Sequence, residues 1–281
     1  MIRVHNLTYT YEKGRSPALK DLNLMIGEGE YIAVIGPNGC GKTTLIRHFN
    51  ALLLPSAGEV QVDNFSTRDS KNVLEIRRRV GMAFQNADNQ IVGMSVEEDI
   101  AFGPGNLGLP AVEVRRRVDE ALGKVGLADL RTRPPHTLSG GQKQLLALAG
   151  LLAMEPKVIV LDEPTASLDP EGKKKVLALI QKLNSQGMGI IHVTHSMDEA
   201  ALADRVLVMD QGELIADGNP GDILNRVEWL KSLGLAPPLI TELMWQLQQG
   251  GEDVSTSIFT IGAAVEEITA LLARMKADGN V

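Results

Sequence analysis

A glycine-rich segment directly follows the apolar run Tyr31–Ile35, and this arrangement constrains the fold more than any other feature of the chain. The segment matches the pattern G-x4-G-K-[ST] and reads Gly36-Pro37-Asn38-Gly39-Cys40-Gly41-Lys42-Thr43-Thr44. Its glycines let the backbone curl so that successive N–H groups point inward at phosphate oxygens. The helix-forming residues Leu45-Ile46-Arg47 come next, and a helix N-terminus adds positive charge. The pattern predicts a buried strand, a phosphate-binding loop and a helix, in that order.

Two polar side chains of this loop have predicted roles in binding a nucleoside triphosphate. Lys42 supplies a positive charge to the β- and γ-phosphates, and the hydroxyl of Thr43 can ligate Mg²⁺. The other loop residues, from Gly36 to Thr44, are expected to contact the phosphates as well.

A pair of carboxylates follows a second apolar run, Val158–Leu161. At the end of a buried strand, Asp162 can hold the hydration shell of Mg²⁺ opposite Thr43. Glu163 lies one residue further, where it can orient and deprotonate a water that attacks the γ-phosphate. An Asp-Glu pair is common on protein surfaces, but its position after a buried strand, in a chain that also has a phosphate loop, favours catalysis.

A third segment, Leu138-Ser139-Gly140-Gly141-Gln142, opens a long apolar helix from Lys143 to Met154. A hydroxyl and two glycines at a helix start are typical of an anion-binding terminus. A plain N-cap serine followed by a glycine hinge explains the same residues.

Strands and helices alternate along the chain, which predicts a doubly wound α/β core. Further buried strands are expected at Gly189–Val193 and Arg205–Met209, because continuous apolar runs suit strands covered on both faces. Apolar residues recur with a helical period over residues 111–125 and 170–186.

Residues 226–281 have a different pattern and predict a small appended module, too small to be stable alone. We expect a helix over Leu239–Gln249, a strand over Val254–Ile261 and an amphipathic helix over 263–276.

Charge and cysteine content exclude several classes of protein. The 28 Lys and Arg against 35 Asp and Glu give a net charge of −7, which argues against broad nucleic-acid binding. The one cysteine, Cys40, cannot form an intrachain disulfide, so a reducing compartment is expected. The amino terminus lacks the apolar region of a signal peptide, and the longest apolar stretch, Leu145–Met154, is about half of the ~20 residues that span a bilayer.

Together these motifs resemble the nucleotide-binding subunits of ATP-binding cassette (ABC) transporters over residues 1 to about 225. The resemblance implies an ABC nucleotide-binding domain of the P-loop NTPase class, with a RecA-like parallel sheet, an antiparallel β subdomain and a helical subdomain at about 86–155. It implies that Tyr11 stacks on adenine, although a plain strand tyrosine is the alternative. It also implies that Gln85 is the Q-loop glutamine, that Ser167-Leu168-Asp169 is the D-loop, and that His195 senses the γ-phosphate.

The resemblance further implies ATP hydrolysis by two chains stacked head to tail. Lys42, Glu163 and His195 would be catalytic, and Thr43, Gln85 and Asp162 would hold Mg²⁺. The partner chain would contribute its signature and D-loop residues in trans: Ser139, Gly140, Gly141, Gln142 and Asp169.

Residues after the Q-loop resemble the ATPase subunits of energy-coupling factor transporters, which import vitamins or nickel and cobalt ions in prokaryotes. The matching segments are Gln85–Gln90, Val96–Pro104 and Asn106–Pro110. The resemblance implies a peripheral subunit on the cytoplasmic face of the cell membrane. Its partners would be a second ATPase subunit, identical or related, a transmembrane coupling protein contacted near Gln85–Phe102, and a substrate-binding membrane subunit.

The C-terminal region, 226–281, would help to hold the ATPase dimer together. The sequence departs from the family pattern at Ala87 (usually proline), Gly105 (often glutamate) and Leu145 (usually arginine). The transported solute does not follow from the sequence.

Three alternatives stay open: the ATPase of another ABC importer type, such as one for polar amino acids; a soluble ABC ATPase outside transport; and a non-hydrolysing nucleotide-dependent module. Cys40, in place of the usual serine, lies near a helix N-terminus, which can lower a thiol pKa. We therefore expect that alkylation of Cys40 inactivates the protein and that Mg-ATP protects it, unless the thiol is inert.

Overall fold

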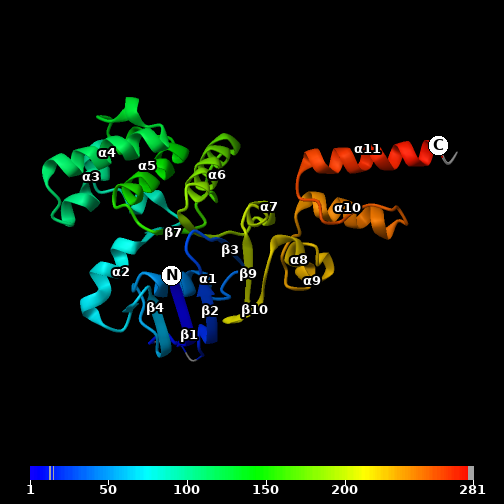
Figure 1. Ribbon diagram of the computed structural model, residues 1–281, viewed down its shortest axis with the longest axis horizontal. Helices are drawn as coiled ribbons and strands as arrows, with labels where there is room; N and C mark the ends of the chain where they lie inside the picture. The colour runs from blue at the N-terminus through cyan, green and yellow to red at the C-terminus, as the bar shows by residue number, and fades with distance from the viewer. Residues whose placement is uncertain (13, 15, 278–281) are drawn as a thin grey trace.

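The computed structural model describes residues 1–12, 14 and 16–277. Figure 1 shows a body of two sheets, a helical subdomain on one side of it, and a helical hairpin that extends away on the other. Within the described residues, no helix combines the length and apolar character needed to cross a membrane.

A six-stranded sheet forms the centre of the body, in the order β10-β9-β3-β8-β7-β6. Only β10 (Glu213–Gly218) runs antiparallel to its neighbour. The five parallel strands are β3 (Tyr31–Ile35), β6 (Val80–Ala83), β7 (Val158–Asp162), β8 (Gly189–Val193) and β9 (Arg205–Asp210). The apolar runs of the sequence therefore form the parallel core that they predict, and they are buried on both faces.

The register of the sheet brings three strand ends level. Val34 in β3 pairs with Val193 in β8, and Val193 in turn pairs with Asp162 in β7. The segments that follow these three strands therefore leave the sheet at the same edge. This edge is where ligands bind in open α/β sheets.

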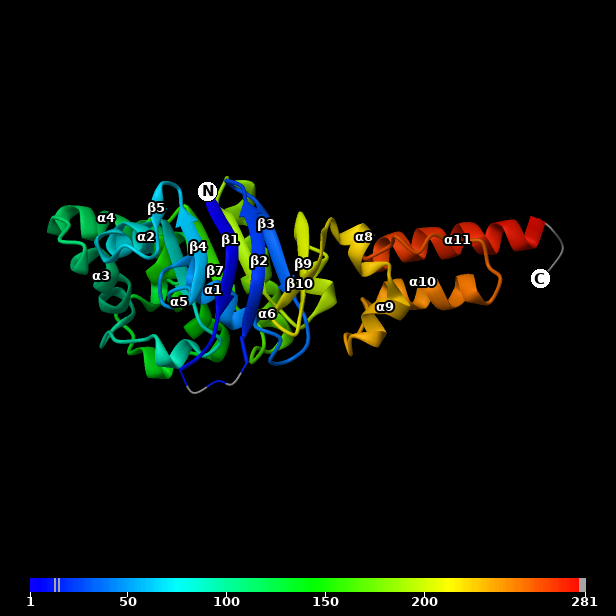
Figure 2. The ribbon, with the colours of Figure 1, turned by 90° about the horizontal axis from the view of Figure 1, so that it is seen from below.

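A second, antiparallel sheet covers one face of the central sheet (Figure 2). It has the order β2-β1-β4-β5 and consists of β1 (Ile2–Tyr9), β2 (Leu19–Ile26), β4 (Ala57–Val62) and β5 (Phe65–Ser66). The helix α1 (Lys42–Phe49) packs in the same layer, and its Leu45 and Phe49 join a core with Ile32 and Val34 of β3.

Helices cover the opposite face, where Tyr31, Ala33 and Ile35 of β3 are buried. The helical subdomain contains α3 (Val96–Asn106), α4 (Ala111–Val125) and α5 (Gly140–Ala153), and α6 (Pro170–Ser185) lies beside α5. The predicted helices over 111–125 and 170–186 are confirmed to within one residue. The remaining short helices of the body are α2 (Val73–Arg79), α7 (Met197–Ala200), α8 (Pro220–Leu224) and α9 (Val227–Ser232), and four 3₁₀ turns span Ser70–Asn72, Ala87–Asn89, Ala128–Leu130 and Pro135–Thr137.

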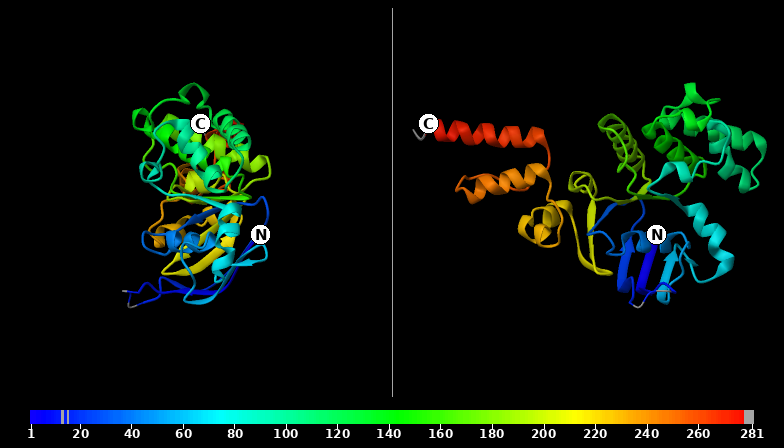
Figure 3. Two further views of the ribbon diagram at one scale, coloured as in Figure 1. Left: turned by 90° about the vertical axis from the view of Figure 1, so that its left-hand side faces the viewer. Right: turned by 180° about the vertical axis from the view of Figure 1, so that it is seen from behind.

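The C-terminal module is helical, not α/β as the sequence suggests. It consists of α10 (Leu239–Gln249) and α11 (Ile261–Ala277), which lie side by side beyond the body in Figures 2 and 3. The predicted strand over 254–261 is wrong. Val254 and Ile258 are buried against Met244 and Leu271 in the small core of the hairpin, so this β-branched segment packs between helices and has no strand to pair with.

The first part of the C-terminal region belongs to the body. Leu230 in α9 and Leu235 are buried in the main core, so the hairpin begins after Pro237-Pro238. A Lys231–Glu242 ion pair of 2.5 Å and a hydrogen bond from Asn225 to Ser257 connect the hairpin to the body.

Candidate nucleotide-hydrolysis site

The phosphate loop connects β3 to α1 and needs glycine at its two ends. Gly36 has φ +151°, and a Cβ there would lie 2.2 Å from the carbonyl oxygen of Met209. Gly41 has φ +110° and caps α1, and its Cβ would lie 2.8 Å from the carbonyl oxygen of Ala18. Any side chain at either position would clash with backbone, so the glycine spacing follows directly from how the loop packs on the sheet.

Lys42 and Thr43 begin α1, and their polar atoms point to different parts of the site. The buried Lys42 ammonium donates hydrogen bonds to the carbonyl oxygens of Gly36 (2.7 Å) and Pro37 (2.9 Å), so it lies over the loop. The Thr43 hydroxyl donates to Asp162 Oδ2 at 3.0 Å. Burial raises the pKa of Asp162, and the Thr43 hydrogen bond opposes that shift. The predicted pairing of loop threonine and strand-end carboxylate is therefore present.

Glu163 lies at the tip of β7 in a strained backbone conformation. Its φ of +51° is unusual for a residue with a side chain, and its N–H donates to the carbonyl oxygen of Val193 at 3.0 Å. One carboxylate oxygen lies 2.5 Å from His195 Nε2, and the other accepts a hydrogen bond from Gln85 Nε2 at 3.0 Å. The structure thus brings together three residues that are far apart in the sequence.

Tyr11 lies beside the phosphate loop. Its hydroxyl and that of Thr44 are 3.0 Å apart, and its ring packs edge-on against Tyr9. The Tyr11 side chain is 41% exposed, so a planar ligand can reach its ring. Adenine stacking on Tyr11 stays a prediction.

Cys40 does not have the environment expected of a reactive thiol. It is 4% exposed and packs with the apolar core under the loop. Burial raises the pKa of Cys40, and the nearby Lys42 only partly offsets this. The expectation of a lowered thiol pKa is therefore wrong: α1 begins at Lys42, and the Cys40 side chain points into the core below it.

The segment Leu138-Ser139-Gly140-Gly141-Gln142 forms the start of α5, and its cavity is lined by none of the phosphate-loop residues. Ser139 and Gln142 make a capping box, in which each side chain accepts a hydrogen bond from the other residue's N–H. Asp169 caps the neighbouring α6 by accepting from Gly172 N at 3.0 Å. Gly141 and Gly172 let the two helix starts approach closely, and Ser139, Gly141 and Asp169 line a shared cavity of about 390 Å³. Leu145, where the family pattern has arginine, is buried beside this cavity.

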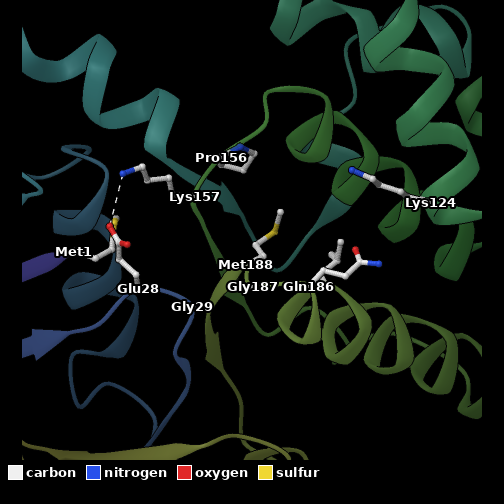
Figure 4. A pocket seen from close by; sticks show the side chains of 10 residues that line it. Met1, Glu28, Gly29, Lys124, Pro156, Lys157, Gln186, Gly187 and Met188 are labelled. Atoms are coloured by element: carbon white, nitrogen blue, oxygen red, sulfur yellow. Dashed lines mark ion pairs between the residues drawn. The ribbon is translucent and has the colours of Figure 1, made fainter.

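Another cavity, of about 400 Å³, lies at the opposite edge of the central sheet (Figure 4). It is lined by Gly29, Lys157 and Met188, which precede β3, β7 and β8, and by Lys124 at the end of α4. Because the phosphate loop, Glu163 and His195 all follow the carboxyl ends of these strands, this cavity is not part of the candidate site.

Comparison with known proteins identifies the family. The family model described as "ABC transporter" matches residues 19–166, which include the phosphate loop and both carboxylates. This chain belongs to the ABC transporter family. It is 51% identical to the cobalt import ATP-binding protein CbiO of Syntrophus aciditrophicus, over 96% of each chain. It is 50% identical to the energy-coupling factor transporter ATP-binding protein EcfA1 of Caldanaerobacter subterraneus, over 95% of this chain and 98% of the relative.

Solved structures of ABC proteins have the same fold. CbiO1 of Clostridium perfringens, part of the ABC transporter complex CbiONQ, has a TM-score of 0.75 and 41% identity over 87% of this chain and 98% of that one. The dimeric cassette MJ0796 in a post-hydrolysis state with ADP and Pi has a TM-score of 0.70 and 33% identity over 78% of this chain and 99% of that one. The predicted ABC ATPase fold and ATPase class are confirmed.

One acidic residue of this ABC domain, Glu199, is not distinguished by the sequence pattern. Glu199 in α7 is buried and connects segments on both sides of the site. Its only sequence signal, Ser196-x-x-Glu199, is typical of an ordinary helix capping box. This pattern does not predict a buried carboxylate beside the candidate site.

Proposed function

We propose that this chain is the ATP-binding and hydrolysing subunit of an energy-coupling factor importer for vitamins or transition-metal ions. The observation that carries the proposal is about 50% identity to proteins named for such transporters across nearly the whole chain, including the helical hairpin after the catalytic domain. Energy from ATP would pass to a membrane partner, and the choice of solute would reside in a separate membrane subunit.

The residues present fit a magnesium ion held with the triphosphate. The Thr43 hydroxyl and the Asp162 carboxylate lie 3.0 Å apart and offer the hard oxygen ligands that Mg²⁺ prefers, and Gln85 completes the proposed set. Mg²⁺ neutralises charge on the β- and γ-phosphates when it is bound.

The chain's own groups account for the remaining requirements of phosphoryl transfer, which are positioning and charge neutralisation. Lys42 would exchange its hydrogen bonds to loop carbonyls for phosphate oxygens. Glu163 would orient and deprotonate the attacking water, and His195, 2.5 Å from Glu163, would contact the γ-phosphate.

A second ATPase subunit would complete each site. Within one chain, Ser139, Gly141 and Asp169 line a cavity separate from the phosphate loop. This arrangement suits contact with ATP held by a partner, to which Gly140 and Gln142 would contribute as well. The hairpin would strengthen the dimer through its exposed apolar side chains, which are Leu239, Leu243, Ile261, Val265 and Leu272.

The transmembrane coupling protein would dock near Gln85–Phe102, with the chain held on the cytoplasmic face of the membrane. Ala87–Asn89 forms a short helical turn, and its Asp88 makes an ion pair of 2.6 Å with Lys143 of α5. The apolar side chains of Val92, Met94 and Phe102 are more than half exposed nearby, and such a patch is typical of a protein interface.

Mass spectrometry of the intact complex, purified in detergent from native membranes, tests this proposal. We expect two ATPase subunits with a transmembrane coupling protein and a small substrate-binding membrane protein. Association with the membrane subunits of an importer that uses a separate soluble binding protein would overturn the energy-coupling factor assignment, and purification without any membrane protein would favour a soluble ABC ATPase.

A further inference from the structure

A buried carboxylate in α7 connects the two sides of the hydrolysis site. Glu199 is 2% exposed, and four side chains surround its two oxygens. Oε1 lies 2.7 Å from both Thr165 Oγ1 and Lys173 Nζ, and Oε2 lies 2.8 Å from Thr194 Oγ1 and 3.2 Å from His192 Nε2. A buried charge is costly unless it is paired and hydrogen-bonded, and here each oxygen has two partners.

The surroundings keep Glu199 ionised. Burial opposes ionisation, but contacts from His192, Lys173 and Thr165 outweigh it and lower the pKa of Glu199 to about 2. Tyr31 completes the cluster, because its hydroxyl lies 3.1 Å from His192 Nδ1. Burial raises the pKa of Tyr31, so its hydroxyl keeps its proton and can donate to Nδ1 while Nε2 faces the carboxylate.

Two of these partners hold the turns that carry the catalytic groups. Thr194 directly precedes His195, and its hydroxyl donates to Glu199 and accepts from Ser196 N at 3.0 Å. The turn that presents His195 is therefore fixed at both ends. Thr165 is two residues after Glu163, in the turn closed by a hydrogen bond from Ala166 N to the Glu163 carbonyl oxygen.

The third partner, Lys173, lies in the first turn of α6, where its N–H donates to the carbonyl oxygen of Asp169. The Asp169 side chain caps the same helix. Glu199 thus joins the His195 turn, the Glu163 turn and the start of α6 at one carboxylate, without lining the phosphate loop itself.

We propose that Glu199 is a positioning residue for ATP hydrolysis. Its contacts fix the positions of Glu163 and His195 relative to each other and to the D-loop at Asp169. This inference rests on the ATPase activity of the chain. A purely structural carboxylate would stabilise the fold equally well whether or not His195 were present, whereas a positioning residue acts through the groups that it places.

Steady-state ATPase kinetics of the full-length protein, purified with its membrane subunits, separate these two roles. We expect Glu199→Gln to lower kcat by roughly 10- to 100-fold, because small misplacements of reacting groups have effects of this size, while the KM for ATP stays within about twofold. Thr194→Val should lower kcat in the same direction, and Thr194→Ser, which keeps the hydroxyl, should restore it. In the His195→Ala background, Glu199→Gln should lower kcat by a smaller factor than it does in the wild type, because only its effect on Glu163 and the D-loop remains.

The control variant is Asp63→Asn. Asp63 is a partly buried carboxylate that pairs with Arg79 and Lys157, both at 3.2 Å, and these two residues precede β6 and β7 at the edge of the sheet opposite the hydrolysis site. This change should leave kcat unchanged. Wild-type kcat in folded Glu199→Gln would overturn the positioning role. So would a loss of kcat from Glu199→Gln that is as large in the His195→Ala background as in the wild type. If Glu199→Gln does not fold, equal rates for Thr194→Val and Thr194→Ser would overturn it instead. An inactive wild-type complex would count against the proposed function itself.

Discussion

Replacing Glu163 with glutamine tests the assignment of the catalytic base most directly. The change keeps the size of the side chain and the strained backbone at φ +51°. It removes the negative charge that faces His195 Nε2 at 2.5 Å and accepts from Gln85 Nε2 at 3.0 Å. The amide of glutamine cannot take a proton from water, so the general-base contribution is lost while the shape of the site is kept.

The expected effect is a loss of roughly 100- to 10,000-fold in kcat, the usual contribution of a general base. This range corresponds to about 3–5 kcal/mol of transition-state stabilisation, since each tenfold change in rate is about 1.4 kcal/mol. The affinity for ATP should be nearly unchanged. Lys42 and the loop glycines surround the phosphates in the proposed complex, and within the described residues they form no hydrogen bond or ion pair with the Glu163 side chain.

Phosphate release from the purified complex measures kcat, and a fluorescent ATP analogue measures binding. Size-exclusion chromatography with ATP should show that the variant still forms the closed dimer. The matched control is Glu120→Gln, which removes an exposed carboxylate paired with Arg116 on α4 and should keep full activity. Wild-type turnover by Glu163→Gln, or loss of ATP binding in step with turnover, would refute the assignment.

Three further predictions concern other parts of the molecule. Cys40 should resist maleimide in the native protein and react only after denaturation, since it is 4% exposed and its pKa is raised; rapid labelling of native protein, followed by mass spectrometry, would contradict its burial. The pKa of Glu199 is lowered from 4.5 to about 2, so its ionised form stabilises the native state above pH 4.5 and this stabilisation is lost as the pH falls through 2. The difference in the free energy of unfolding between wild type and Glu199→Gln should therefore be larger above pH 4.5 than below pH 2 by roughly 3 kcal/mol; a pH-independent difference in denaturant melts would exclude this linkage. Val265→Asp on the exposed face of α11 should weaken dimer formation with little change in Tm, because Val265 is 58% exposed; an unchanged dimer in light scattering would remove the hairpin from the interface.

The local pattern of residues was sufficient to predict most of the fold and the positions of the phosphate loop and the two carboxylates at the end of β7. The phosphate loop needs glycine where a side chain would clash with the backbone of Met209 or Ala18. These glycines lie within a few residues of each other, so a short sequence motif is enough to identify the loop. The buried strands could also be predicted from local sequence, because strands covered on both faces must be apolar throughout. Asp162 and Glu163 followed from their place at the end of such a strand.

Features that depend on distant neighbours required the tertiary structure. The thiol environment of Cys40 depends on which way the loop turns above the core, and the segment around Val254 and Ile258 packs between helices although its composition favours a strand. Glu199 has the spacing of a capping residue, yet its side chain turns inward to Thr165, Lys173 and Thr194. A sequence specifies which residues are adjacent along the chain, but the energy of a buried carboxylate is set by the donors that folding brings around it, and these come from segments up to 34 residues away.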